Sequence, residues 1–371
     1  MADIPRNLIV PKNITDALRT VKYPGSNEDV VSLDMPQEIR IAGQRVSFSL
    51  VFQKSDDPNI KTLVLECEKA IKKYVGEEVE IEDNIAVKYI HDMERPVLPN
   101  VKNIIAVASG KGGVGKSTVA VNLAVALARS GAKVGLLDAD IFGPSIPKMF
   151  GSESERPAGI KIDDREMINP IEKFGVKFLS VGFFVDPDSA IIWRGPMASN
   201  ALKQLISEGN WGELDYLFID LPPGTSDIHL TLVQSVPVTG AVIVTTPQDV
   251  ALADVVRGTS MFQSKSIDVP VLGIIENMSW FTPAELPENK YYIFGKDGGK
   301  KLADKLGLNF LGSIPIVQSI REGGDSGKPA ANDPDSLTCA AFDEIAANVK
   351  HRVHVRNIQR APTKKVKIER K

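Results

Sequence analysis

The spacing of hydrophobic positions changes near residue 103, and the two parts of the chain predict different folds. From Gln37, the stretch QEIRIAGQRVSFSLVF alternates apolar and polar positions around Gly43, which predicts a β-hairpin. The next stretch, NIKTLVLECEKAIKKYVG, repeats apolar residues at helical spacing and places Cys67 on the packed face. With a further helix predicted near Ile14 to Val21, residues 1–96 are expected to form a small α+β domain.

The second part alternates apolar, β-branched runs with helical patterns, which predicts an α/β fold with a doubly wound, mostly parallel sheet. The proline-bearing stretch ERPVLPNVKN, Glu94 to Asn103, predicts a joint between the two parts. We therefore expect domains at residues 1–96 and 97–350, followed by a basic tail at 351–371. Strands are predicted at residues 104–108, 133–138, 176–181, 216–220, 241–245, 269–276 and 309–313.

Composition and charge narrow the class of protein. The 371-residue chain is 43% hydrophobic and has a net charge of −3, so no global field favours nucleic acid. No stretch approaches the ~20 apolar residues of a membrane span, and the N-terminus lacks the apolar core of a signal peptide. The two cysteines, Cys67 and Cys339, form no C-x-x-C arrangement. We expect a cytoplasmic protein with no membrane or nucleic-acid partner.

The end of the chain is strongly basic. The segment from Lys350 to Lys371 carries nine Lys or Arg residues against one Glu. Such a run of charge predicts a solvated, weakly ordered end. Contact with nucleic acid or with an acidic partner is the alternative.

A glycine-rich motif, GKGGVGKST, opens the second domain and fits the G-x-x-x-x-G-K-[ST] template of a phosphate-binding loop. It follows the buried-strand pattern IIAVAS and precedes the helical pattern VAVNLAVALARSG. This order directs backbone N–H groups and a helix N-terminus at an anion. The sequence therefore predicts nucleotide binding by Gly110, Lys111, Gly112, Gly113, Val114, Gly115, Lys116, Ser117 and Thr118.

Carboxylates follow two of the predicted strands. Asp138 and Asp140 lie in LLDADIFGPSIPKMFG, at a strand end that faces the phosphate crevice of such a sheet. Asp220 ends the apolar run YLFID, which is Walker B spacing and places an acid beside Mg²⁺, with Ser117 supplying a direct Mg²⁺ oxygen. Gly224, four residues later, is predicted to sense the γ-phosphate through its N–H. Helix capping is the alternative role for the two acids near residue 139.

Two polar residues further along the chain are candidates of a different kind. Asn277 ends the run VLGIIEN, and an amide there can pair with both a donor and an acceptor on an adenine edge. An ordinary turn asparagine is the alternative. His229, after the Walker B segment, is interpreted as structural.

The phosphate-binding loop contains a second lysine, Lys111, in addition to Lys116. The short form K-G-G-x-G-K-[ST] resembles the deviant Walker A motif of the MinD/ParA/ArsA/nitrogenase-iron-protein class. The resemblance implies that Lys111 reaches the nucleotide bound by a partner subunit, as an arginine finger does, so that hydrolysis requires a nucleotide-dependent homodimer. It also implies that Lys116 is catalytic, that Asp138 organises the metal and water, that Asp140 orients the attacking water, and that Asn277 recognises the base. A solvated surface lysine is the alternative for Lys111.

Longer motifs resemble one family within that class. GKGGVGKST, LLDADIFGPSIPKMFG, WRGPM, FIDLPPGTSD, TTPQDVALADVVRG and GIIENMSWF are similar to the Mrp/ApbC iron-sulfur carrier ATPases over roughly Asn103 to Lys350. The preceding domain resembles the small iron-sulfur assembly domain often fused to them. The resemblance implies an ATP- and Mg²⁺-dependent hydrolase that delivers iron-sulfur clusters to apoproteins, with Arg194 near the dimer face.

The chain departs from that family at the cluster ligands. Members usually carry C-x-x-C after the ENMS stretch, where two subunits ligate a four-iron, four-sulfur cluster. Here Trp280 to Gly295 contains neither cysteine nor histidine, and QKSDDPNIK lacks the usual cysteine of the first domain. Cys67 and Cys339 both lie in predicted helices and are interpreted as core residues, so the cluster ligands remain unidentified. The alternative function is a MinD/ParA-like positioning or scaffold ATPase without a cluster.

Overall fold

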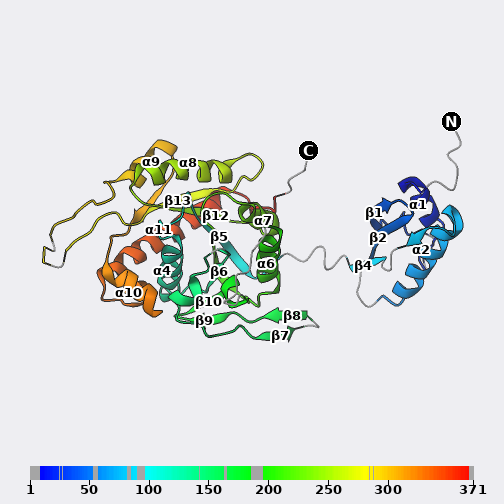
Figure 1. Cartoon of the computed structure of the whole chain (residues 1–371), viewed down its shortest axis with the longest axis horizontal. Coiled ribbons are helices and arrows are strands. Elements are labelled where there is room, and N and C mark those ends of the chain that lie inside the picture. The colour runs from blue at the N-terminus through cyan, green and yellow to red at the C-terminus, as the bar shows by residue number, and fades with distance from the viewer. Residues whose placement is uncertain are drawn as a thin grey trace. The chain divides into compact units, whose positions relative to one another are not determined.

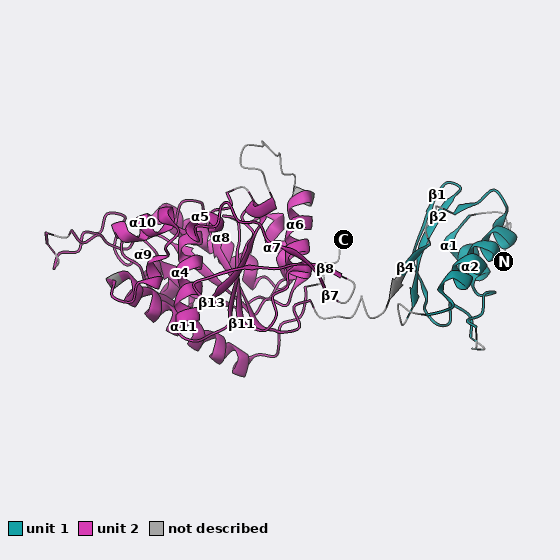
Figure 2. Cartoon of the chain, turned by 90° about the horizontal axis from the view of Figure 1, so that it is seen from below, with its two compact units in different colours: residues 1–96 teal, residues 97–371 magenta. Residues whose placement is uncertain are grey.

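The chain forms two compact units, residues 1–96 and 97–371, which are described separately (Figure 2). The structure is a computed structural model. It describes residues 9–24, 26, 28–52, 57–81, 85–89, 97–141, 143–162, 165–184, 195–283, 285–286 and 288–366.

The first unit packs two helices on a small sheet. Its elements are α1 Pro11–Leu18, β1 Pro36–Ala42, β2 Arg45–Phe52, α2 Ile60–Val75, β3 Glu80–Ile81 and β4 Ala86–Tyr89. β1 and β2 form the predicted antiparallel hairpin, whose turn needs the left-handed φ of 64° at Gly43. β2 also pairs in parallel with β3 and β4. Cys67 on α2 is fully buried in the core, as its helical position predicted.

The second unit contains an eight-stranded sheet with the order β14-β13-β12-β5-β11-β6-β10-β9. Neighbouring strands are parallel except for β9, which runs antiparallel to β10 at one edge. The strands are β5 Val101–Ser109, β6 Val134–Asp138, β9 Ile171–Lys173, β10 Val176–Ser180, β11 Leu214–Asp220, β12 Gly240–Thr245, β13 Val271–Glu276 and β14 Phe310–Ser313. The predicted fold class, a doubly wound and mostly parallel sheet preceded by a small α+β domain, is confirmed.

Helices cover both faces of this sheet (Figure 1). They are α4 Lys116–Arg129, α5 Ile146–Met149, α6 Gly195–Glu208, α7 Asp227–Ser235, α8 Asp249–Gln263, α9 Gly298–Leu306, α10 Gln318–Ser326 and α11 Leu337–Gln359, with short 3-10 turns at Val181–Phe184 and Ala330–Asn332. One core lies between the sheet and α4 and α11, and a second lies between the opposite face and α6, α7, α8 and α9. In the described residues, no helix has the length and apolarity to cross a membrane.

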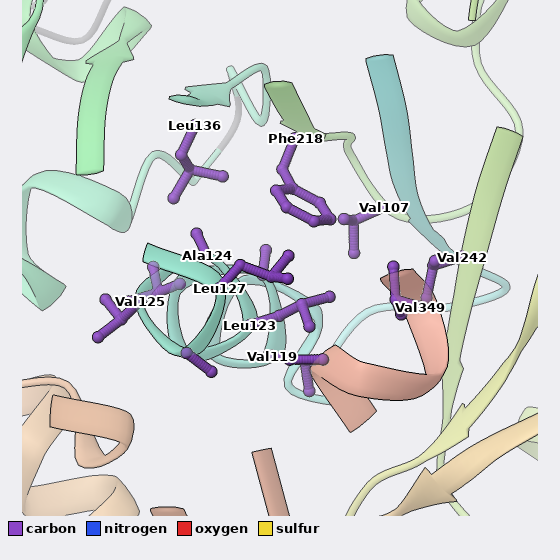
Figure 3. Packing of buried hydrophobic residues seen from close by; sticks show 14 of the residues in the cluster. Val107, Val119, Leu123, Ala124, Val125, Leu127, Leu136, Phe218, Val242 and Val349 are labelled. Carbon is purple, nitrogen blue, oxygen red and sulfur yellow. The ribbon is translucent and has the colours of Figure 1, made fainter. Parts of the chain in front are cut away.

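α4 is buried along most of its length, and this explains its sequence. Apolar or small residues surround it because it packs against the sheet on one side and against α11 on the other. Figure 3 shows Leu123 and Leu127 of α4 among Val107, Phe218 and Val349, which come from β5, β11 and α11. The start of this helix, which bears the phosphate-binding motif, is therefore held rigidly at the end of β5.

The structure differs from the predicted elements in its short strands and in its last helix; β3 and β4 of the first unit, for example, were not predicted. β9 and the hairpin of β7, Gly159–Ile162, with β8, Arg165–Ile168, were not predicted. These are short, partly exposed strands with charged residues, so they lack the long apolar runs of the central strands. The expectation of a weakly ordered end from Lys350 is wrong for its first part, because α11 continues to Gln359 and buries Val353.

Candidate functional site

The glycine-rich loop joins β5 to α4 with backbone angles that only glycine adopts easily. Gly113 has a φ of 80°, and Gly115, the residue before α4, has a φ of 78°. A Cβ on Gly110 would lie 2.4 Å from the backbone carbon of Asp254 in α8, so any larger residue would displace that helix. Val114 is buried and Gly112 and Gly113 are exposed, which presents the middle of the loop to a ligand.

A buried ion pair joins this loop to the Walker B strand. Lys116 Nζ lies 2.7 Å from Asp220 Oδ1, and both side chains are almost fully buried. Ser117 Oγ donates to the other carboxylate oxygen of Asp220 at 2.5 Å. The predicted phosphate lysine, the predicted Mg²⁺ hydroxyl and the predicted Mg²⁺ carboxylate therefore meet at the N-terminus of α4, where the helix dipole favours anions.

The two acids of the second strand end lie beside this pair. Asp140 Oδ2 is 3.7 Å from Lys116 Nζ. Asp138 is fully buried and is the register partner of Asp220 in the neighbouring strand. Burial raises the pKa of Asp138 to about 7, and the nearby Asp220 carboxylate adds to the shift. The structure thus brings three carboxylates around one ammonium group.

Asp138 also organises its own loop. Its Oδ1 accepts the Asp140 N–H at 3.1 Å, and its Oδ2 accepts the Ile146 N–H at 3.3 Å, so its carboxylate shapes the chain that carries Asp140. Ser180 Oγ, at the end of β10, donates to Asp138 Oδ2 at 2.9 Å. Ser180 was not predicted as part of the site. Its position at the end of a predicted strand was the only sequence signal for it.

Gly224 lies against the phosphate-binding loop. Its N–H donates to the Ser109 carbonyl at 2.9 Å, and Ser109 Oγ in turn donates to the Lys111 carbonyl at 3.0 Å. The Gly224 N–H is thus engaged with the end of β5 in this structure. The contact with a γ-phosphate that the sequence predicts would require this bond to break.

The remaining loop residues have distinct surroundings. The side chain of Lys111 is partly exposed, as a contact with a second subunit requires. Thr118 lies on the first turn of α4, where its carbonyl accepts from Asn122. Arg194 lies outside the described residues.

Asn277 is buried and contacts the phosphate-binding loop. Its Nδ2 donates to the Val114 carbonyl at 2.9 Å, and its backbone N–H donates to the Thr245 carbonyl at 2.7 Å. The predicted base-recognition role uses the donor and the acceptor of this amide together. In this structure the donor is already bonded to the loop.

His229, interpreted from the sequence as structural, lies in the first turn of α7. Its Nδ1 accepts the Ser226 N–H, and this bond completes a capping box at the start of the helix. Burial lowers the pKa of His229 to about 4, and the positive charge of Lys116 contributes.

Neither cysteine has the surroundings of an exposed cluster ligand. Burial raises the pKa of the Cys67 thiol to about 12. Cys339 is 1% exposed, and its sulfur contacts Arg129, Asp343 and the Ala331 carbonyl. Among the residues that the structure describes, no group of three or more His, Cys, Asp or Glu side chains is arranged to hold a metal ion.

The segment that follows Asn277 contains several aromatic residues. Between β13 and α9 it projects from the unit in both views (Figures 1 and 2). Phe281 pairs with Tyr291 as an isolated antiparallel bridge, and Lys290 Nζ lies 4.3 Å from the centre of the Trp280 ring. This is the place of the C-x-x-C motif in the resemblance, and the sequence supplies no thiolate there.

The glycine-rich loop, the buried Lys116 and the acidic strand ends together define a P-loop NTPase. Comparison with protein families agrees: the ParA family model, described as NUBPL iron-transfer P-loop NTPase, matches residues 100–350. A second model, described as iron-sulfur cluster assembly protein, matches residues 11–82 of the first unit. The chain belongs to the Mrp/NUBPL family of iron-sulfur cluster carrier proteins, and the resemblance predicted from its motifs is confirmed.

Individual relatives match different shares of the chain. The iron-sulfur cluster carrier protein of Synechocystis sp. is 46% identical over 343 residues, which are 92% of this chain and 97% of that protein. The iron-sulfur cluster transfer protein NUBPL of Dictyostelium discoideum is 50% identical over 262 residues, 70% of this chain and 79% of that protein. A solved structure of the Archaeoglobus fulgidus nucleotide-binding protein in complex with ADP is 38% identical, with a TM-score of 0.56 over 64% of this chain and 92% of that one.

Proposed function

We propose that this protein binds and hydrolyses ATP with Mg²⁺, acts as a homodimer and carries iron-sulfur clusters to apoproteins. The observation that carries the ATPase part is the buried contact of Lys116 with Asp220, with Ser117 and Asp140 beside it. The family of cluster carriers to which the chain belongs supports the cargo.

Nucleotide binding follows from the charge at the loop. Lys116 is paired with Asp220, and an ATP phosphate offers it a second, more highly charged anionic partner. If Lys116 turned to the phosphates, Asp220 would lose its cation and would be available to hold Mg²⁺. Ser117 Oγ and Asp220 are oxygen donors of the kind that Mg²⁺ prefers, and their closeness fits a shared ion. Mg²⁺ held by these residues would supply positive charge that favours phosphoryl transfer. The ADP complex of the Archaeoglobus fulgidus relative supports this use of the loop.

Hydrolysis then needs an oriented water and compensation of the developing charge. Asp140 lies near Lys116 on a loop that Asp138 holds in place, which suits a residue that accepts a hydrogen bond from the attacking water. Lys111 of a second copy supplies the remaining charge across the dimer face. Asn277 is proposed to contact the adenine with the carbonyl oxygen of its side chain.

The cluster is cargo, and this chain holds it differently from relatives with C-x-x-C. Both cysteines are buried, and Trp280 to Gly295 contains no thiolate or imidazole. We expect a labile cluster, held partly by non-thiolate groups or by the client protein. Anaerobic reconstitution with iron and sulfide, followed by iron counting and absorbance spectroscopy, tests this part of the proposal.

The missing ligands also favour a second candidate function. If reconstituted protein retains no iron while ATP hydrolysis is intact, the chain is an ATP-switched assembly or scaffold factor of the MinD/ParA class. The absence of cysteine and histidine from Trp280 to Gly295 is the observation behind this alternative.

A further inference from the structure

Asn277 holds the backbone of the phosphate-binding loop from outside the loop. It follows β13, and its side chain reaches Val114, 163 positions earlier in the sequence, with a bond of 2.9 Å from Nδ2 to the carbonyl oxygen. Its exposure is 7%, so this bond is largely shielded from water. A shielded bond is lost at greater cost, because the carbonyl left behind is poorly solvated.

The contact extends to the next residue of the loop. A Cβ built on Gly115 would lie 2.3 Å from Asn277 Nδ2, so the amide fills the space that a side chain would occupy. The backbone of Asn277 is itself fixed, because its N–H donates to the Thr245 carbonyl at the end of β12. The amide is therefore a rigid support and not a loose surface group.

The bond determines how one peptide group is oriented. The described part of the chain contains no cis peptide bonds, so the Val114 carbonyl and the Gly115 N–H point in opposite directions. Holding the carbonyl toward Asn277 turns the Gly115 N–H away from it. Backbone N–H groups of such a loop are the donors that cradle phosphates.

We infer that Asn277 is a positioning residue for the phosphate-binding loop: it fixes the Val114–Gly115 peptide so that its N–H is ready to bind phosphate. The inference deepens the proposed function, since it rests on nucleotide binding at this loop. In this role Asn277 contributes to the binding affinity of every triphosphate, whatever its base. Recognition of adenine, in contrast, adds nothing to the affinity of a ligand that has no base.

Inorganic tripolyphosphate separates the two roles. Isothermal titration would compare tripolyphosphate, ATP and GTP on wild-type protein, Asn277→Ala and Asn277→Leu. The leucine variant keeps the volume beside Gly115, in case the alanine variant does not fold. Asn309→Ala is the matched control, because Asn309 Nδ2 also donates to a backbone carbonyl, that of Leu272, but near the start of β13, at the end of the strand away from Asn277.

We expect both Asn277 variants to bind tripolyphosphate about tenfold more weakly than the wild type, and to lose ATP affinity by at least the same factor, because ATP also loses the proposed contact with the adenine. Asn309→Ala should bind all three ligands like the wild type. Unchanged tripolyphosphate affinity in the Asn277 variants would overturn the inference, and a loss confined to ATP would assign the residue to the base.

Hydrogen exchange of the nucleotide-free protein tests, without any ligand, whether Asn277 supports the phosphate-binding loop. Peptides covering residues 110–118 should exchange faster in Asn277→Ala than in the wild type and in Asn309→Ala. If the wild-type protein bound no triphosphate, the proposed function would fail, and this measurement would still test the support of the loop. Equal exchange in all three proteins would overturn the inference.

Discussion

Lys116 and Asp220 form a buried ion pair, 2.7 Å between Nζ and Oδ1, that connects the phosphate-binding loop to the end of β11. The pair lies among carboxylates, since Asp140 contacts the same ammonium group and Asp138 is the strand neighbour of Asp220. One cation therefore compensates the charge of several acids before any nucleotide binds. Removal of that cation leaves buried negative charge where phosphates must enter.

This relationship predicts the outcome of Lys116→Ala. The variant loses the contact to the phosphates and leaves the acids near Asp220 uncompensated, so both effects oppose nucleotide binding. We expect no detectable Mg²⁺-dependent ATP hydrolysis, measured as phosphate release. Lys102→Ala is the matched control, because Lys102 pairs with Asp215 but is exposed and lies at the start of β5. Full activity of Lys116→Ala would reject the site.

Lys111→Ala should separate binding from hydrolysis. Its side chain is partly exposed, and the proposed role acts on the nucleotide of the second copy, so ATP affinity should stay close to that of the wild type. Contacts of the arginine-finger kind contribute ~10³ or more to the rate, and turnover should fall by that order. Wild-type turnover per subunit should also fall on dilution below the dimerisation constant. Constant turnover on dilution would count against a dimeric site.

His229 should make the nucleotide-free protein sensitive to acid. Its pKa is 6.5 in the unfolded chain and about 4 in the folded one, so the unfolded chain binds the proton first as the pH falls. This contribution to stability is complete above pH 6.5 and is lost as the pH falls toward 4. Between pH 7.5 and 4.5 the loss should be about 2–3 kcal/mol.

His229→Gln isolates that loss, because glutamine at this position can keep the capping box with Ser226 without titrating. Urea unfolding at both pH values should show a smaller drop in the free energy of unfolding for the variant than for the wild type. His354→Gln, at an exposed position of α11, should behave as the wild type does. An equal drop in wild type and His229→Gln would show that His229 does not carry the effect.

The central fold was readable from the sequence because its strands are buried on both faces. Such strands are continuous apolar runs, and all seven predicted strands occur within three residues of their expected ends. β9 was missed because a three-residue edge strand, IEK, has no such run. The length of α11 was missed because its last turns are basic, and only Val353 anchors them in the core.

The sequence predicted those parts of the candidate site in which the spacing of a motif determines which side chains meet. Lys116, Ser117 and Asp220 meet as their motifs predict, since parallel strand ends share one edge of the sheet. The contacts of Ser180 with Asp138 and of Asn277 with Val114 could not be predicted. Each depends on how two distant strand ends pack, and no local pattern records that packing.

The burial of both cysteines predicts how their replacement affects the iron-sulfur cluster. Because Cys67 and Cys339 are buried in the cores of their units, replacing both with serine should leave the iron content after anaerobic reconstitution unchanged. Loss of iron in either single variant would identify that cysteine as a ligand and show that its helix opens. About four irons per dimer, unchanged in the double variant, would show a robust site without thiolates and would contradict the expected labile cluster.

A carrier must deliver its cluster to another protein, and a cluster-transfer assay measures this delivery. The protein would be loaded anaerobically, freed of unbound iron and mixed with an apo-ferredoxin, and the absorbance spectrum of the ferredoxin would report the cluster that it receives. A sample of free iron and sulfide at the same concentration, without the protein, is the control. We expect the loaded protein to deliver clusters faster than this control. Protein that retains no iron, or that transfers no faster than free iron and sulfide, would contradict a carrier function.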